Sequence, residues 1–193
     1  MSFEIRWSVD EKEWAEIRLR AGDIDFERGS FARLAGLDGF VQFAFNGDVL
    51  FPVALLTAIA DYEQRRAKQG NWQLPWPREW YLQGLMTSLI DLAYQLDLII
   101  ADPNNLAREG DSDFYSEKDG SLVVRFTRGK DSILISSDAR GSGYDCRLEV
   151  PAADFRDGII VFLRQIAADI QIKAPEVLGW DVAAGLRRYR SSG

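Results

Sequence analysis

The chain contains no histidine and a single cysteine, Cys146, in its 193 residues. Without histidine there is no Ser-His-Asp or Cys-His catalysis, no imidazole acid or base, and no His-ligated metal site. One cysteine cannot form an internal disulfide and is too few for a thiolate zinc site or an iron–sulfur cluster. The sequence therefore favours a reducing compartment, the cytoplasm, and it predicts no metal site and no cofactor.

The chain also lacks a long hydrophobic run. Residues 52–60 form an apolar stretch that is too short to span a bilayer, and residues 89–100 are interrupted by Asp91 and Asp97. The first fourteen residues carry charges where a signal peptide needs an apolar core. We therefore expect no membrane contact and no secretion signal.

Acidic residues outnumber basic ones by 30 to 23, which gives a net charge of −7. This balance disfavours nonspecific binding to nucleic acid and is compatible with a basic protein partner, although mild acidity also simply confers solubility. The hydrophobic content of 47% is typical of an ordered globule. The length predicts a single domain over residues 1–193, with 187–193 as a frayed tail.

The segment Asp113–Val150 contains three short apolar runs separated by turns rich in Gly, Asp and Lys. Apolar residues alternate with polar ones in each run, which predicts three antiparallel strands with one buried face. Such a sheet needs a cover, and the remaining chain is expected to supply it. The residues predicted to face the core are Leu122, Val124, Phe126, Ile133, Ile135, Leu148 and Val150.

Further elements are predicted from hydrophobic periodicity and from turn residues. Alternation predicts strands at 3–9 and 40–45, the latter followed by an Asn46-Gly47 turn. Residues 14–26 are ambiguous, but the two halves on either side of Ala21-Gly22 alternate and suit strands better than a helix. Helical spacing predicts helices at 52–69, 78–98 and 151–172, with a possible short helix within 176–189. The predicted class is α+β: an antiparallel sheet with about three main helices, mostly covering one face.

The segment Asn71–Pro77 (NWQLPWP) has the most unusual local composition. Exposed tryptophans bury a large area on binding, so Trp72 and Trp76 are candidate binding residues. In the alternative interpretation the rings fold inward and hold the loop against the following helix, to which Trp80 and Tyr81 belong. The outer face of the predicted meander is a second candidate: Arg125 and Leu134 lie there and are either solvated or contacted by a partner.

Other groups carry weaker signals and give no catalytic residue. The acidic residues of 102–113 and 23–27 match no calcium-loop pattern and are expected to be solvated. Gly141-Ser142-Gly143 lacks the G-x-S-x-G pattern and is expected to be a turn. The basic end formed by Arg187, Arg188 and Arg190 either binds an acidic groove or a phosphate, or is solvated. Cys146 is expected to be a buried small side chain.

Three segments carry a resemblance to a known class of protein: Gly47–Leu56 (GDVLFPVALL), Asp119–Phe126 (DGSLVVRF) and Pro151–Phe155 (PAADF). Over about Phe40–Ile172 the chain resembles small acidic immunity proteins encoded beside bacterial polymorphic toxins. The resemblance implies a cytoplasmic protein that blocks one toxin by occlusion and performs no chemistry of its own.

The sequence thus leads to a non-catalytic protein-binding protein, an immunity-type inhibitor whose partner is a basic toxin domain. An enzyme that acts on a sugar or a phosphoester through carboxylates or a divalent cation is the alternative. A third possibility is a subunit of a larger assembly that associates through the apolar stripe of Tyr81–Leu96. The sequence does not define the partner or the oligomeric state.

Overall fold

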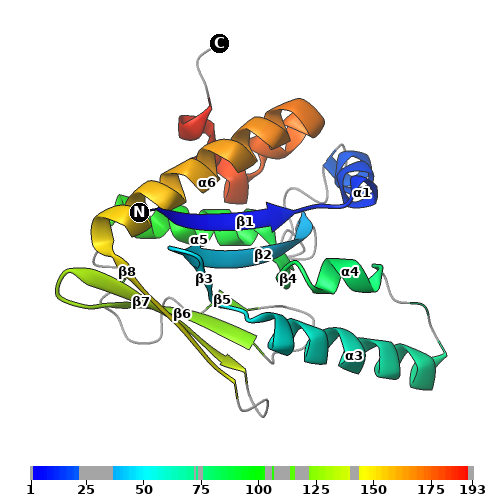
Figure 1. Ribbon diagram of the computed structural model, residues 1–193. Coiled ribbons are helices and arrows are strands. Elements are labelled where there is room, and N and C mark those ends of the chain that lie inside the picture. The colour runs from blue at the N-terminus through cyan, green and yellow to red at the C-terminus, as the bar shows by residue number, and fades with distance from the viewer. Residues whose placement is uncertain are drawn as a thin grey trace.

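The computed structural model describes residues 2–21, 37–71, 73, 76–102, 106, 114–115, 122–139 and 144–190. Its strands form two antiparallel sheets (Figure 1). Sheet A contains β1 (Phe3–Ser8), β2 (Asp38–Phe45), β3 (Asp48–Val49) and β4 (Leu85–Ser88). Sheet B contains β5 (Phe114–Tyr115), β6 (Leu122–Arg128), β7 (Ser132–Ala139) and β8 (Asp145–Pro151).

The longest helices are α3 (Val53–Gly70), α5 (Leu89–Ala101) and α6 (Ala152–Lys173), and two shorter ones are α1 (Glu11–Ala21) and α4 (Arg78–Tyr81). The 3₁₀ helices η3 (Pro175–Gly179) and η4 (Asp181–Tyr189) follow α6. The predicted α+β class is confirmed, and the strands divide between two sheets where the sequence predicted one. No helix in the described ranges is long and apolar enough to cross a membrane.

Strands β6, β7 and β8 of sheet B form the predicted meander, and the two-residue strand β5 adds to its β6 edge. Strand β7 pairs with β6 on one side and with β8 on the other, so that Phe126, Ile135 and Leu148 stand in one row across the sheet. These three side chains are buried, while Thr127 and Glu149 on the other face are exposed. The alternation of the sequence therefore predicted the buried face of this sheet correctly. Cys146 is also buried there, as expected.

In sheet A, β2 is central: β1 pairs along one side, and β3 and β4 share the other side. The predicted tight turn follows β2, with positive φ angles of 53° at Asn46 and 94° at Gly47. These angles suit Asn and Gly, which adopt the left-handed region most readily. The turn returns the chain to pair as β3 before α3 begins.

One hydrophobic cluster joins the two sheets and the helices that pack on them. The ring of Phe126 in sheet B lies 5.9 Å from that of Phe43 in sheet A and 5.6 Å from that of Phe155 in α6. A smaller cluster on the opposite face of sheet A contains Phe40, Ala60, Trp76 and Tyr81. Sheet A is therefore packed on both faces.

The prediction of a strand at 14–26 is wrong for residues 14–21, which belong to helix α1. Asp10 caps this helix, because its Oδ1 accepts a hydrogen bond of 2.8 Å from the Lys12 backbone N–H. Trp14 and Ile17, three residues apart, are buried on one side, whereas Leu19 is 83% exposed. The alternation of Ile17 and Leu19 therefore did not reflect a strand. Residues 22–26 lie outside the described ranges.

The single helix predicted at 78–98 is also wrong. The structure has α4, then a turn, then β4, and α5 begins only at Leu89. The interruption is at Gly84, where an added Cβ would lie 2.2 Å from the carbonyl oxygen of Val41. Only a residue without a side chain permits this approach to β2. Ser88 then caps α5 by accepting a hydrogen bond of 3.3 Å from the Asp91 N–H.

The apolar stripe of Tyr81–Leu96 is buried inside the chain and does not provide the surface that was considered for self-association. Its members Tyr81, Leu85, Leu89, Leu92 and Leu96 are at most 6% exposed.

Candidate functional site

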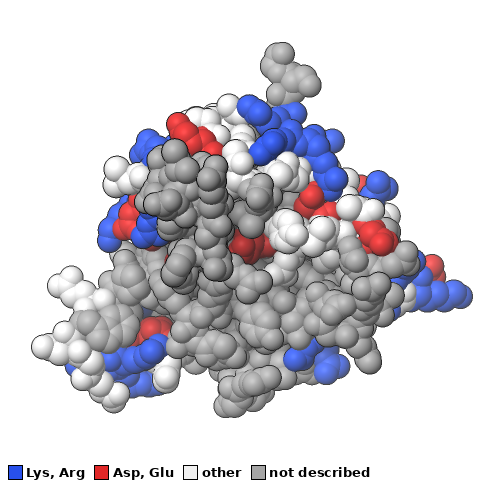
Figure 2. All heavy atoms as spheres, turned by 180° about the vertical axis from the view of Figure 1, so that it is seen from behind, with Lys and Arg blue, Asp and Glu red and all other residues white. Residues whose placement is uncertain are grey.

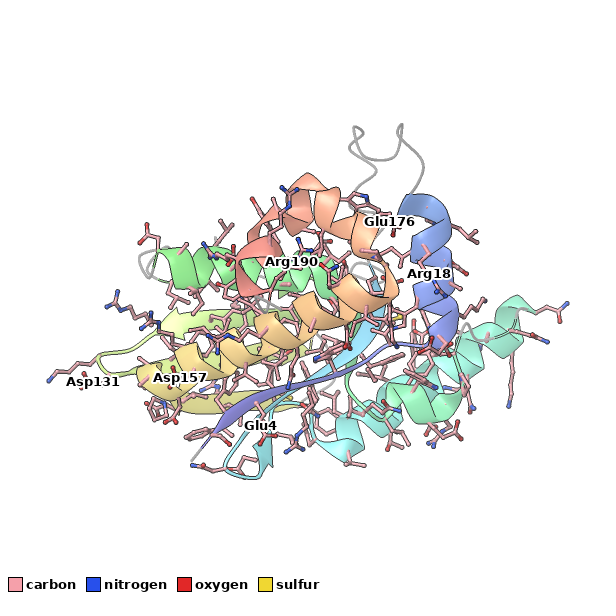
Figure 3. The ribbon with its side chains drawn as sticks, turned by 90° about the horizontal axis from the view of Figure 1, so that it is seen from above. Glu4, Arg18, Asp131, Asp157, Glu176 and Arg190 are labelled. Atoms are coloured by element: carbon pink, nitrogen blue, oxygen red, sulfur yellow. The ribbon has the colours of Figure 1, made fainter. Side chains whose placement is uncertain are left out.

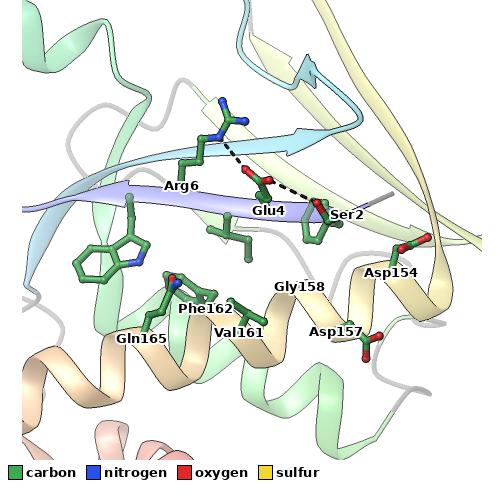
Figure 4. Close-up of a pocket in the computed structure, with 12 residues that line it drawn as sticks. Ser2, Glu4, Arg6, Asp154, Asp157, Gly158, Val161, Phe162 and Gln165 are labelled. Carbon is green, nitrogen blue, oxygen red and sulfur yellow. Dashed lines mark hydrogen bonds and ion pairs between the residues drawn. The ribbon is translucent and has the colours of Figure 1, made fainter.

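A groove lies between strand β1 and the flank of helix α6, and we call it the β1–α6 groove (Figure 4). It encloses about 570 Å³. A second hollow of about 540 Å³ shares Trp7 and Gln165 with it and reaches Trp14 and Lys173. The groove is lined by residues 2–7 and by Asp154, Asp157, Gly158, Val161, Phe162 and Gln165.

The groove exists because α6 approaches β1 closely at one point and less closely beyond it. An added Cβ at Gly158 would lie 2.4 Å from the carbonyl oxygen of Phe3, so the two backbones are in contact there. Ring contacts anchor the two elements on either side: Phe3 with Phe155 at 5.4 Å and Trp7 with Phe162 at 6.4 Å. The position of α6 against β1 is therefore fixed by Gly158 and by these two aromatic pairs.

One wall of the groove is the free edge of β1. An added Cβ at Gly39 would lie 2.7 Å from the Ser8 carbonyl oxygen, so Ser8 points its backbone toward β2. The Phe3 carbonyl points the other way, toward α6. Because backbone groups alternate along an antiparallel strand, Ile5 and Trp7 direct their N–H and C=O groups into the groove. Within the described ranges no backbone group pairs with them on that side.

The groove has an apolar floor and an acidic end. Val161 is 50% exposed although it is aliphatic, and it lies beside the buried ring of Phe162. Asp154 and Asp157 stand on the first two turns of α6, where the helix dipole favours negative charge. Neither carboxylate forms a hydrogen bond or an ion pair with any residue that the structure describes.

The cations near the groove are already paired. Arg6 donates a hydrogen bond of 3.0 Å from Nε to Glu4 on the rim of the groove (Figure 4). At the far end of the second hollow, the Lys173 ammonium lies 2.7 Å from Glu11 and 5.1 Å from the centre of the Trp14 ring. Glu4 and Asp157 stand on β1 and α6, respectively, and Figure 3 shows them at the same end of the groove. Because Glu4 is paired with Arg6, the negative charge of that end comes from Asp154 and Asp157.

The structure does not bring the predicted binding residues together in one site. Trp76 is 5% exposed and packs edge-on against Phe40 at 5.7 Å between ring centres, so its ring faces the interior. This is the inward arrangement that was considered as the alternative for the loop. Trp72 lies outside the described residues. Tyr81 and the half-buried Trp80 pack against the same Phe40 ring.

Arg125 and Leu134 share the outer face of sheet B, in adjacent cross-strand rows. Arg125 is opposite Ser136, and Leu134 is opposite Thr127. Both side chains are half-buried. They remain candidates for partner contact, but they are on a different sheet from the β1–α6 groove. The side chain of Val123 on this face lies outside the described set.

The basic residues near the C-terminus are largely held by the protein itself. Arg188 donates to the side chain of Asp97, which is 8% exposed, and the Tyr189 hydroxyl donates to the same oxygen at 2.8 Å. Burial and this carboxylate raise the pKa of Tyr189 above its ordinary value. Arg187 donates to the Leu178 and Gly179 carbonyls at 2.6 and 3.1 Å. Figure 2 shows the basic side chains gathered over η4.

The described residues contain no group of three or more His, Cys, Asp or Glu side chains that could hold a metal ion. Of the acidic candidates, Asp102 ends α5, whereas the acidic residues of 103–113 and 23–27 lie outside the described ranges. Gly141-Ser142-Gly143 lies outside them as well.

The β1–α6 groove was not predicted from the sequence. The alternation of Phe3, Ile5 and Trp7 predicted the strand, and helical spacing predicted α6, but nothing in either pattern placed the two elements side by side. A glycine within an otherwise apolar helix, Gly158, is the one local signal of a close backbone approach.

No protein-family model, curated protein or solved structure matches this chain.

Proposed function

We propose that this chain is a non-catalytic protein-binding protein, an immunity-type inhibitor that acts in the cytoplasm by occluding a basic bacterial toxin domain. The observation that carries the proposal is the acidic end of the β1–α6 groove, where Asp154 and Asp157 have no partner among the described residues. Exposed carboxylates beside an apolar floor suit a partner that offers cations around an apolar anchor.

The composition supports the same conclusion. A net charge of −7 attracts a basic protein over a distance of about one Debye length, roughly 8–10 Å at physiological salt. The chain has no histidine for acid–base chemistry near neutral pH. Residues Phe40–Ile172 resemble small acidic immunity proteins, and this resemblance indicates the class of partner: a toxin that is encoded beside its inhibitor.

The proposal is tested by purifying the protein from the cells that encode it, at low ionic strength. We expect a basic protein to co-purify in stoichiometric amount and to dissociate as the salt concentration rises, because the association is steered by charge. Expression of that partner alone is expected to arrest growth, and co-expression with this chain is expected to restore it. Recovery of no stoichiometric partner at low salt would contradict the proposal.

A further inference from the structure

We infer that the β1–α6 groove receives an extended, basic segment of the partner, which adds as a strand to the free edge of β1. This inference rests on the proposed function, because it assigns a place and a conformation to the partner. Strand addition uses main-chain hydrogen bonds for affinity and pockets for alternate side chains for specificity.

The main-chain requirement is met by Ile5 and Trp7. Their N–H and C=O groups point into the groove, and no other described strand pairs with β1 on that side. An unpaired strand edge is a ready template for another extended chain. At Phe3 the approach of Gly158 covers the edge, so pairing is confined to the part of β1 that follows Phe3.

The side-chain requirement is met by the two surfaces that flank this edge. Successive side chains of an added strand alternate between two faces. On one face they would meet Val161 and the rings of Phe162 and Trp7, which suit small apolar residues. On the other face they would lie beside Glu4 and its partner Arg6, and past the Gly158–Phe3 contact the segment would approach Asp154 and Asp157, which pair with no described residue. The expected segment therefore alternates apolar and basic residues.

A second copy of this chain fits the edge less well than a segment of a partner. Helix α6 lies along β1 for much of the strand, as the contacts of Phe3 with Phe155 and of Trp7 with Phe162 show. Pairing of β1 with its own copy would bring a second α6 to the same narrow space. A single extended segment carries no such helix. The charges also favour a foreign segment, because the acidic ends of two copies would repel each other.

The inference is tested with a synthetic peptide of roughly seven residues, long enough to span β1, in which lysine or arginine alternates with valine. Binding is followed by the amide resonances of the isotopically labelled full-length protein. We expect the resonances of Ile5 and Trp7 to shift the most. Replacing the basic residues of the peptide with glutamate, or methylating the backbone nitrogens that face β1, is expected to abolish these shifts.

Variants of the protein test the acidic end. Asp154→Asn and Asp157→Asn are each expected to weaken peptide binding about threefold, and their combination about tenfold, as for exposed ion pairs that act independently. Glu176→Gln removes the same charge from η3, away from the groove (Figure 3), and is expected to leave the affinity unchanged. Shifts centred elsewhere, equal binding of the glutamate peptide, or no shift at millimolar peptide would overturn the inference.

The partner found by co-purification separates this inference from the proposed function. Hydrogen exchange at the Ile5 and Trp7 amides is expected to slow in the complex. If the partner binds but these amides exchange as in the free protein, the inference fails and the proposed function stands. If the peptide binds in the groove but no cellular partner exists, the groove assignment stands and the proposed function fails.

Discussion

The α-carbon of Gly158 in α6 lies against the backbone carbonyl of Phe3 in β1, although the two residues are 155 positions apart in the sequence. The contact joins the N-terminal strand to the helix that follows the meander. It also divides the β1–α6 groove, because the edge of β1 is open at Ile5 and Trp7 on one side of the contact, and the acidic end with Asp154 and Asp157 lies on the other side. The width of the groove therefore depends on the absence of a side chain at position 158.

Gly158→Ala is expected to destabilise the protein by about 1–2 kcal/mol, even though alanine is the better helix former, because the new methyl group overlaps the Phe3 carbonyl and displaces the helix. Urea denaturation measures the change. Gly179→Ala is the control, since a Cβ there would meet no atom within 4 Å. Equal stability of Gly158→Ala and the wild type would contradict the importance of this contact.

Tyr189→Phe is expected to lower the free energy of unfolding by about 1 kcal/mol, because it removes the hydrogen bond that the Tyr189 hydroxyl donates to the buried Asp97 carboxylate. Thermal or urea denaturation detects a change of this size. Tyr94→Phe removes a hydroxyl from a side chain that is 42% exposed and serves as the control, with no expected effect. If both variants have the same stability, the hydrogen bond does not hold η4 to α5.

The stability of the protein is expected to fall in the alkaline range through Tyr81. Burial, and to a lesser extent the charge of Glu63, raise the pKa of Tyr81 from 10.0 to about 12. A raised pKa means that the fold favours the neutral phenol. The contribution of Tyr81 is therefore fully present below pH 10 and is lost as the pH rises toward 12.

The measurement is the unfolding free energy at a series of pH values from 9 to 12 for the wild type and for Tyr81→Phe. Phenylalanine does not titrate, so the variant is expected to lose less stability than the wild type over this window. All other titrating groups are common to both proteins and cancel in the comparison. Identical pH profiles would show that Tyr81 titrates as in the unfolded chain.

The sequence predicted correctly those helices and strands in which the order of apolar and polar residues matches the buried and exposed faces. The meander of sheet B has one buried face and one exposed face, so its alternation of residues identified the strands and the face of Phe126 and Ile135. Helices α3 and α6 were found because their apolar residues recur at helical spacing. In these elements the local pattern and the tertiary environment agree.

The prediction failed where tertiary contacts decide between two patterns. Residues 85–88 (Leu-Met-Thr-Ser) suit either a helix or a strand, and pairing with β2 beside Gly84 makes them a strand. In α1 the cap at Asp10 and the burial of Trp14 and Ile17 override an alternation that suited a strand. The groove was missed for a related reason: it depends on how β1 and α6 approach, and neither pattern contains that information.

Gln42 on the central strand of sheet A is a polar residue whose side chain is buried. It lies on the face of β2 opposite Val41 and is only 7% exposed. Its amide forms two hydrogen bonds with the backbone of Phe51: Nε2 donates to the carbonyl at 2.7 Å, and Oε1 accepts from the N–H at 3.0 Å. The side chain thus continues the pairing of β2 beyond β3.

Gln42→Leu is expected to destabilise the protein by about 2–4 kcal/mol, because a leucine of similar size leaves two buried backbone groups without a partner, each at a cost of about 1–3 kcal/mol. Gln42→Glu retains the acceptor and loses the donor, so its stability is expected to recover in part at low pH, where the carboxyl group is protonated and can again donate to the Phe51 carbonyl. Urea denaturation at pH 4 and pH 7 measures both effects. Gln165→Leu, on the exposed flank of α6, is the control. Equal stability of Gln42→Leu and Gln165→Leu would contradict this account, because only Gln42 satisfies buried backbone groups.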